Sequence, residues 1–230
     1  MLENVLNSTG HASRRAGPVQ RLLRTRAVWR LSGLNYWSAC MATKGRLMTR
    51  HALLAHCRQE MQLIRSVFRE DDVVVEFGCG LGGNMIANAG SVQEIVGIDI
   101  NPYYLRHARR LSRAYPNCRL ELYEGGELPF ADASVDVVYS WAVFERIPKP
   151  AVAAYLQEFS RILKPRGRSA VYLLRPAAKD TGFTRLLGED AYVYFDREEA
   201  EALMANSGFA IERFVDWPTA HVCLAEKRDA

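Results

Sequence analysis

A run of glycines after a strongly apolar segment carries the clearest chemical signal in the chain. Val73-Val74-Val75 is a β-branched run typical of a strand buried on both faces, and Gly78, Gly80 and Gly82 follow it. Glycines in such a turn let the backbone lie against a ligand with no Cβ in the way, and amides at the next helix start can meet electron-rich atoms. With Gly83 the stretch satisfies both GxGxxG and GxGxG. The glycines alone therefore do not decide the ligand.

Two carboxylates near this loop narrow the choice of ligand. Glu76 lies two residues before the first glycine, where it would repel a pyrophosphate and suit a cationic ligand. Asp99 closes the next apolar run and is placed to accept both ribose hydroxyls of an adenosine ligand, with Ile100 beside it for the adenine face. Structural interpretations stay open for both: Glu76 as a strand-capping acid, and Asn101-Pro102 as the N-cap and first position of a helix.

The elements that must position these residues alternate along the chain. Apolar runs predict strands, and amphipathic patterns between them predict helices. We expect five strands at 73–75, 94–99, 119–123, 135–140 and 169–174, and intervening helices at 85–89, 102–113 and 151–163. Such alternation predicts parallel strands joined by right-handed crossovers.

The two ends of the chain depart from this alternation. Before the first strand we expect a loose arm over 1–18, a basic amphipathic helix over 20–30 and a second helix from about 44 to 68. After the fifth strand an irregular segment, 175–195, precedes a helix from Asp196 to Asn206, with Asp196 as N-cap and Gly208 just beyond its end. Two last strands, 211–217 and 221–226, are separated by a short turn and should pair antiparallel.

Together these residues resemble the class I S-adenosylmethionine-dependent methyltransferases, and most closely their small-molecule branch. The acid and GxGxG of the family's first motif correspond to residues 76–82, and the acid that ends its second strand corresponds to Asp99. Residues 123–130 are similar to the stretch before the family's fourth strand, which 134–140 resembles. Residues 161–167 resemble its Leu-Lys-Pro-Gly-Gly turn. The resemblance covers about residues 66–227 with every element in order.

The resemblance implies a fold, a domain division and a cofactor. We expect an α/β fold: a seven-stranded Rossmann-like sheet, mostly parallel with an antiparallel last strand, plus an N-terminal helical extension. Residues 1–65 would form an arm and helical cap over the ligand-binding edge, and 66–230 the S-adenosylmethionine-binding domain, with a substrate-shaping insert at about 175–195. The residues expected to bind S-adenosyl-L-methionine are Glu76, Gly78, Cys79, Gly80, Asp99, Ile100, Glu124, Gly125, Ser140 and Trp141.

Two departures from the family pattern bear on recognition and mechanism. Glu124, which would face the adenine amino group while the Gly125 amide meets the ring, replaces the family's usual Asp. Arg146 stands where many relatives carry a His, and a guanidinium cannot act as a base at neutral pH. We therefore identify no catalytic residue from the sequence. No metal site is expected either, because His51 and His56 are five residues apart and would not share a helix face.

Composition and charge limit the class of protein and its partners. The 230 residues are 49% hydrophobic and 24% charged, which excludes a disordered or low-complexity chain. Residues 1–69 hold eleven Arg and one Lys against two Glu, about +10, and the remainder is about −6. Such an arm suits nucleic acid, an acidic membrane surface or an acidic substrate. However, Arg outnumbers Lys 25 to 5 across the chain, and the aromatic-basic pattern of RNA binding is missing.

The cysteines and apolar runs indicate a compartment. Five scattered Cys with no CxxC pair argue against disulfides or zinc and suit a reducing cytosol. The longest uncharged run, 77–93, is too short and too polar to span a bilayer, and no signal peptide is expected. The sequence thus predicts a cytoplasmic protein without a transmembrane segment, and it is compatible with a homodimer.

The expected function is in-line methyl transfer to a small-molecule acceptor, a specialised metabolite or a lipid-like intermediate. Aromatic residues in the patch 34–41 and in the insert suit a mostly apolar pocket, with Tyr36, Tyr192 and Tyr194 as substrate contacts. Three alternatives stay open: an RNA methyltransferase that uses the basic segment, a nicotinamide-dependent oxidoreductase, and a non-catalytic cofactor-binding module.

Overall fold

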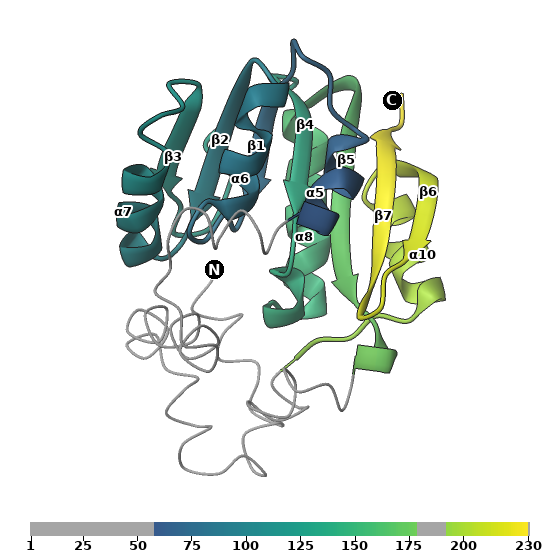
Figure 1. Ribbon diagram of the computed structural model, residues 1–230. Coiled ribbons are helices and arrows are strands. Elements are labelled where there is room, and N and C mark those ends of the chain that lie inside the picture. The colour runs from purple at the N-terminus through teal and green to yellow at the C-terminus, as the bar shows by residue number, and fades with distance from the viewer. Residues whose placement is uncertain (1–57, 179–191, 230) are drawn as a thin grey trace, which may run out of the picture. The chain divides into compact units, whose positions relative to one another are not determined.

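Seven strands form the centre of the structure, a computed structural model that describes residues 58–178 and 192–229 (Figure 1). They form one sheet in the order β3-β2-β1-β4-β5-β7-β6. Neighbouring strands are parallel in the pairs β1/β2, β2/β3 and β4/β5, whereas β7 runs antiparallel to both β5 and β6. The predicted Rossmann-like sheet with an antiparallel last strand is confirmed. The described chain divides into two compact units, residues 58–124 and the residues from Gly125 onward.

The first unit contains three parallel strands and the helices between them. The strands are β1 (Val73–Phe77), β2 (Glu94–Asp99) and β3 (Cys118–Leu122); the helices are α5 (Arg58–Arg65), α6 (Gly83–Asn88), η2 (Ala89–Ser91) and α7 (Pro102–Leu111). Val74 and Val75 of β1 are buried as expected, Val73 is half-buried, and α7 packs against β2 and β3. The Asn101 side chain accepts hydrogen bonds from the N–H groups of Tyr103 and Tyr104, which confirms Asn101 as the N-cap of α7.

The second unit holds the other four strands. They are β4 (Val135–Ser140), β5 (Leu163–Leu174), β6 (Phe209–Asp216) and β7 (Ala220–Lys227); the helices are η3 (Phe144–Arg146), α8 (Lys149–Ile162), η4 (Pro176–Ala178) and α10 (Arg197–Asn206). Asp196 caps α10 as predicted, within a capping box that Glu199 completes. Gly208 follows the end of α10 at φ +88°. Helix α10 packs against β6 and β7.

The main error in the predicted elements concerns the turn at 161–167. The structure assigns its residues from Leu163 onward to β5, which begins six residues earlier than expected. Leu163 pairs with Val135 and Arg168 pairs with Val137, so the residues between Leu163 and Arg168 bulge out of the pairing. Arg166 has φ +59° within that bulge. The expected turn therefore exists as a bulge inside a longer strand.

Other boundaries move by one to three residues. Strand β3 begins at Cys118 and leaves Tyr123 outside it, α6 begins at Gly83, and α7 ends at Leu111. The expected helix over 44–68 is described only from Arg58, and it ends at Arg65. The predicted elements over 1–30, the patch 34–41 and most of the insert lie outside the described residues. Of the helices in the described ranges, none is long and apolar enough to cross a membrane.

Candidate functional site

The glycine-rich loop turns back over the end of β2 immediately after β1. The N–H groups of Gly78 and Cys79 both donate to the Ile98 carbonyl oxygen, at 2.8 and 3.0 Å. Gly80 has φ +53°, and a Cβ built there would meet no atom of the described residues within 4 Å. Within that part of the chain the backbone at Gly80 is therefore uncovered, as a loop that receives a ligand requires.

Asp99 holds this loop and the start of α7 together. Its Oδ2 accepts a hydrogen bond from the Gly80 N–H and its Oδ1 accepts one from the Asn101 N–H, both at 2.8 Å. Each carboxylate oxygen keeps a further acceptor position for a ribose hydroxyl. Burial raises the pKa of Asp99, and backbone N–H donors, with Asn101 first and Gly80 second, partly offset that rise. The side chain of Ile100 is 57% exposed beside it.

Glu76 and Cys79 are buried beneath the loop. Glu76 is 3% exposed and pairs in register with Gly97 of β2. Burial, and then the charges of Asp99 and Glu76, raise the pKa of the Cys79 thiol. A Cβ at Gly97 would lie 2.8 Å from Cys79 Sγ, so only glycine lets the loop lie this close to β2. Gly97 was missed from the sequence, although a glycine inside a strand is a known sign of close backbone approach.

The segment after β3 begins beside Asp99. The Tyr123 N–H donates to the Asp99 carbonyl oxygen at 3.0 Å, and Tyr123 is buried against Phe77. Glu124, the next residue, is exposed. Gly125 has φ +106°, in the region that favours glycine. The first unit thus brings the glycine loop, Asp99 and Glu124 to the same end of its strands.

In the second unit, an aromatic cluster follows β4. Ser140 ends the strand; its hydroxyl is buried and, within residues 58–178 and 192–229, has no hydrogen-bond partner. The Trp141 ring centroid lies 5.0 Å from that of Tyr172 and 5.8 Å from that of Trp217. Ala142 adopts φ +55°, a strained conformation of the kind that clusters at functional sites. Tyr172 and Trp217 were not predicted, because they contact Trp141 from distant parts of the chain, β5 and the β6–β7 turn.

A polar cluster occupies the turn η3. Arg146 donates from Nη2 to the Tyr192 hydroxyl at 3.2 Å, and its guanidinium lies 4.5 Å from the centroid of that ring. The Val193 N–H donates to the Glu145 carbonyl oxygen at 2.8 Å, which places the Tyr192–Tyr194 pair beside η3. Arg146, which replaces the family's His, is therefore bonded to one of the predicted substrate residues. Tyr36 lies outside the described residues.

Glu145 is the functional candidate that the sequence did not reveal. It is 2% exposed, and within the described part of the chain its Oε2 has no hydrogen-bond partner. Burial raises the pKa of Glu145, and the Arg146 charge only partly opposes the rise. A buried carboxyl that lacks a partner for one oxygen costs free energy, so it is a candidate for a chemical role. The one sequence feature that could have pointed to Glu145 is its position next to Arg146, which replaces the family's His.

Metal ligation finds no support in the part of the chain that the structure describes. Within those residues no group of three or more His, Cys, Asp or Glu side chains could hold a metal ion. His51 and His56 lie outside them.

Comparison with known proteins finds similarity over the stretch of the chain that contains β1 to β4 and the start of β5. Residues 74–167 match the family model described as a methyltransferase domain. The chain is 33% identical over 139 residues to a probable S-adenosylmethionine-dependent methyltransferase of Mycolicibacterium smegmatis, covering 60% of this chain and 52% of that protein. It is 31% identical to a demethylmenaquinone methyltransferase of Tropheryma whipplei, covering 43% of this chain and 40% of the relative. The chain thus spans about half or less of these relatives' lengths.

Among solved structures, the fold is similar to geranyl diphosphate C-methyltransferase from Streptomyces coelicolor in complex with Mg²⁺, geranyl diphosphate and S-adenosyl-L-homocysteine. The TM-score is 0.62 at 16% identity, over 75% of this chain and 77% of that chain. This similarity concerns the fold.

Proposed function

Because this chain belongs to the class I S-adenosylmethionine-dependent methyltransferases, we propose that it transfers the methyl group of S-adenosyl-L-methionine to a small-molecule acceptor. The observation that supports this proposal most is the hydrogen bond from the Gly80 N–H to the Asp99 carboxylate. A glycine backbone that no described residue covers lies beside a carboxylate with further acceptor positions, and this combination suits an adenosine ligand. A pyrophosphate suits it less, because the Glu76 carboxyl group lies two residues before the first glycine of the loop.

The first unit supplies most of the proposed cofactor contacts. Asp99 would accept the ribose hydroxyls, the exposed Ile100 side chain would cover one adenine face, and the Gly78–Gly80 backbone would lie along the amino-acid part. Glu124 would accept from the adenine amino group, and the Gly125 N–H would donate to the ring. Cys79 would contribute through its backbone only, because its thiol is buried against Gly97.

In the second unit, Ser140 and Trp141 at the end of β4 are further proposed cofactor-binding residues, which follow from the family resemblance alone. Trp141, Tyr172 and Trp217 offer an aromatic surface for an apolar acceptor skeleton, and Tyr192 would touch the acceptor near Arg146.

The sulfonium supplies an electrophilic methyl group, so the chain's main task is positioning. The residues around the acceptor must hold its nucleophilic atom about 3 Å from the methyl carbon and exclude water. Arg146 stays protonated and can pair with an anionic group on the acceptor. This account needs no His at position 146.

The relatives favour apolar acceptors. Their names specify demethylmenaquinone, a sterol and 2-methyl-6-phytyl-1,4-hydroquinone, and each relative is only partly covered by this chain. We therefore propose a lipid-like or specialised-metabolite acceptor with an apolar skeleton. We also propose that residues 66–230 form the S-adenosylmethionine-binding methyltransferase domain, that 1–65 form an N-terminal arm and helical cap, and that the protein acts in the cytoplasm and can form a homodimer.

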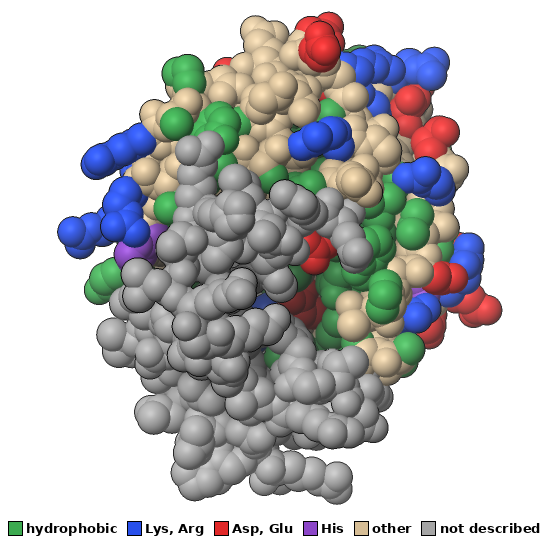
Figure 2. All heavy atoms as spheres, in the orientation of Figure 1, with side chains coloured by type: hydrophobic (Ala, Val, Ile, Leu, Met, Phe, Trp, Pro, Cys, Tyr) green, Lys and Arg blue, Asp and Glu red, His purple; other side chains and the backbone are tan. Residues whose placement is uncertain are grey.

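An RNA methyltransferase is the second candidate, on the strength of the +10 charge of residues 1–69. The described part of the face in Figure 2 carries both acidic and basic side chains and so does not form a uniformly basic surface.

Binding of S-adenosyl-L-homocysteine tests the cofactor side of the proposal. A ligand that binds only the folded protein must raise its melting temperature, and calorimetry should detect the complex directly. NAD, added in parallel, should do neither. Binding of NAD without binding of S-adenosyl-L-homocysteine would instead support an oxidoreductase.

A further inference from the structure

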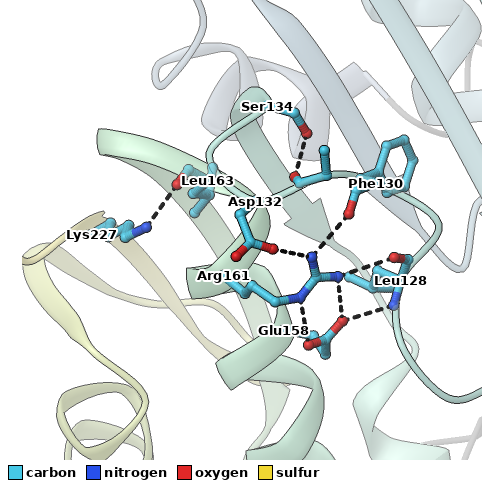
Figure 3. A network of polar contacts seen from close by, with 9 residues as sticks. Leu128, Phe130, Asp132, Ser134, Glu158, Arg161, Leu163 and Lys227 are labelled. Atoms are coloured by element: carbon cyan, nitrogen blue, oxygen red, sulfur yellow. Dashed lines mark hydrogen bonds and ion pairs between the residues drawn. The ribbon is translucent and has the colours of Figure 1, made fainter.

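Arg161, near the end of α8, lies at the centre of a polar network that the cofactor contacts do not include. Its Nε and Nη2 donate to the two carboxylate oxygens of Glu158, at 2.8 and 2.7 Å, in a bidentate pair (Figure 3). Its Nη1 donates to Asp132 Oδ1 at 2.7 Å. These charge-assisted bonds orient the guanidinium strongly. They also lower the pKa of Glu158 and raise that of Arg161.

The same guanidinium binds the backbone of the loop before β4. Nη2 donates to the Leu128 carbonyl oxygen at 3.1 Å, and Nη1 donates to the Phe130 carbonyl oxygen at 3.0 Å. The Leu128 N–H donates in turn to Glu158 Oε2 at 2.8 Å. Both backbone groups of Leu128 are therefore bonded to one ion pair, as Figure 3 shows.

This loop needs such support because it has no regular structure of its own. Residues 123–134 include neither helix nor strand. Gly125 and Gly126 have φ +106° and +93°, and glycine backbones lose more conformational freedom on ordering than any other residue. Leu128, three residues beyond Gly125, is 3% exposed and bonded at both backbone groups. The ion pair thus fixes one end of a short, glycine-containing segment whose other end follows Glu124.

We propose that Arg161 and Glu158 are positioning residues for the base of the cofactor: by fixing Leu128, they hold Glu124 and Gly125 in the geometry that selects a 6-amino purine over a 6-oxo purine. The inference depends on the proposed adenine contacts. A 6-amino group donates to the Glu124 carboxylate, and the ring nitrogen beside it accepts from the Gly125 N–H. In a 6-oxo purine both groups are reversed, so an acceptor meets the carboxylate and a donor meets the N–H. Such mismatches discriminate strongly only where the site is held rigidly.

The test compares S-adenosyl-L-homocysteine with S-inosyl-L-homocysteine, which differ only at that edge of the base. Calorimetric titration of the full chain should give the wild-type protein about a tenfold or greater preference for the adenine compound, the equivalent of one hydrogen bond. Arg161→Met should weaken S-adenosyl-L-homocysteine binding about tenfold and reduce the preference to about threefold or less. Arg161→Lys keeps the charge but not the planar fork, so it should restore little of the preference.

Lys164→Met is the matched control. Lys164 forms an ion pair with Asp136 at 2.8 Å and binds neither Leu128 nor Phe130 through any contact described for it. This variant loses the same charge and one ion pair, so it should keep the wild-type preference even if its melting temperature falls. If Arg161→Met does not fold, Arg161→Lys and Glu158→Gln provide the same comparison.

Three results would overturn the inference: an unchanged preference in folded Arg161 variants, equal weakening of both ligands, or no preference in the wild-type protein. Failure of the wild-type protein to bind either compound would instead count against the proposed function.

Discussion

Replacement of Asp99 by Asn probes the cofactor site with the smallest change in shape. The Asp99 carboxylate accepts from two backbone N–H groups at 2.8 Å and keeps further acceptor positions on both oxygens. An amide has one acceptor oxygen, so its NH₂ group must face either one of those N–H groups or a ribose hydroxyl. The loss of one hydrogen bond to a charged acceptor corresponds to about 1.5–3 kcal/mol, or about 10- to 150-fold in affinity.

Calorimetric titration with S-adenosyl-L-homocysteine measures this loss directly. Asp71→Asn is a suitable control, because Asp71 is exposed and lies before β1 in the same unit. It removes the same charge and should leave the affinity unchanged. Thermal unfolding of both variants without ligand separates weaker binding from a less stable fold. A folded Asp99→Asn protein that binds with wild-type affinity would refute the ribose assignment.

Three further variants test the surroundings of the site. Gly80→Val places a branched side chain where the ligand is proposed to lie, on a backbone at φ +53°, so S-adenosyl-L-homocysteine binding should be lost; calorimetry that shows retained binding would mean that the ligand lies elsewhere. Gly97→Ala brings a Cβ to within 2.8 Å of Cys79 Sγ and should destabilise the protein by about 1–3 kcal/mol in denaturant unfolding, whereas an unchanged midpoint would contradict the close approach. Glu145→Gln should change the pH dependence of stability. Because burial raises the pKa of Glu145 in the folded state, the folded protein holds that proton more tightly, and this contribution to stability is lost as pH rises through the raised pKa. The variant should lose less stability than the wild-type protein as the pH rises above the ordinary pKa of a Glu side chain. Parallel stability curves for the two proteins would contradict a raised pKa of Glu145.

The features of the site that lie close together in the chain could be predicted from the sequence. The apolar run Val73–Val75, the glycines after it and the acid at Asp99 are local signals, and each lies where the pattern placed it. The N-caps Asn101 and Asp196 were equally predictable, because a cap bonds to residues two or three positions ahead.

The missed features depend on contacts between distant residues. The bulge in β5 follows from its register with β4, which pairs Leu163 with Val135, and no local pattern encodes that register. The requirement for glycine at position 97 comes from Cys79, on a different strand end. The burial of Glu145 likewise results from the packing of β5 and the segment at Val193 around η3.

The central claim is tested most directly by following a labelled methyl group. The protein is incubated with methyl-labelled S-adenosyl-L-methionine together with a small-molecule extract and, separately, with total RNA. We predict label in an apolar small molecule, with formation of an equal amount of S-adenosyl-L-homocysteine, and loss of both products in the Gly80→Val variant. Label in RNA and none in the small-molecule extract would contradict the account.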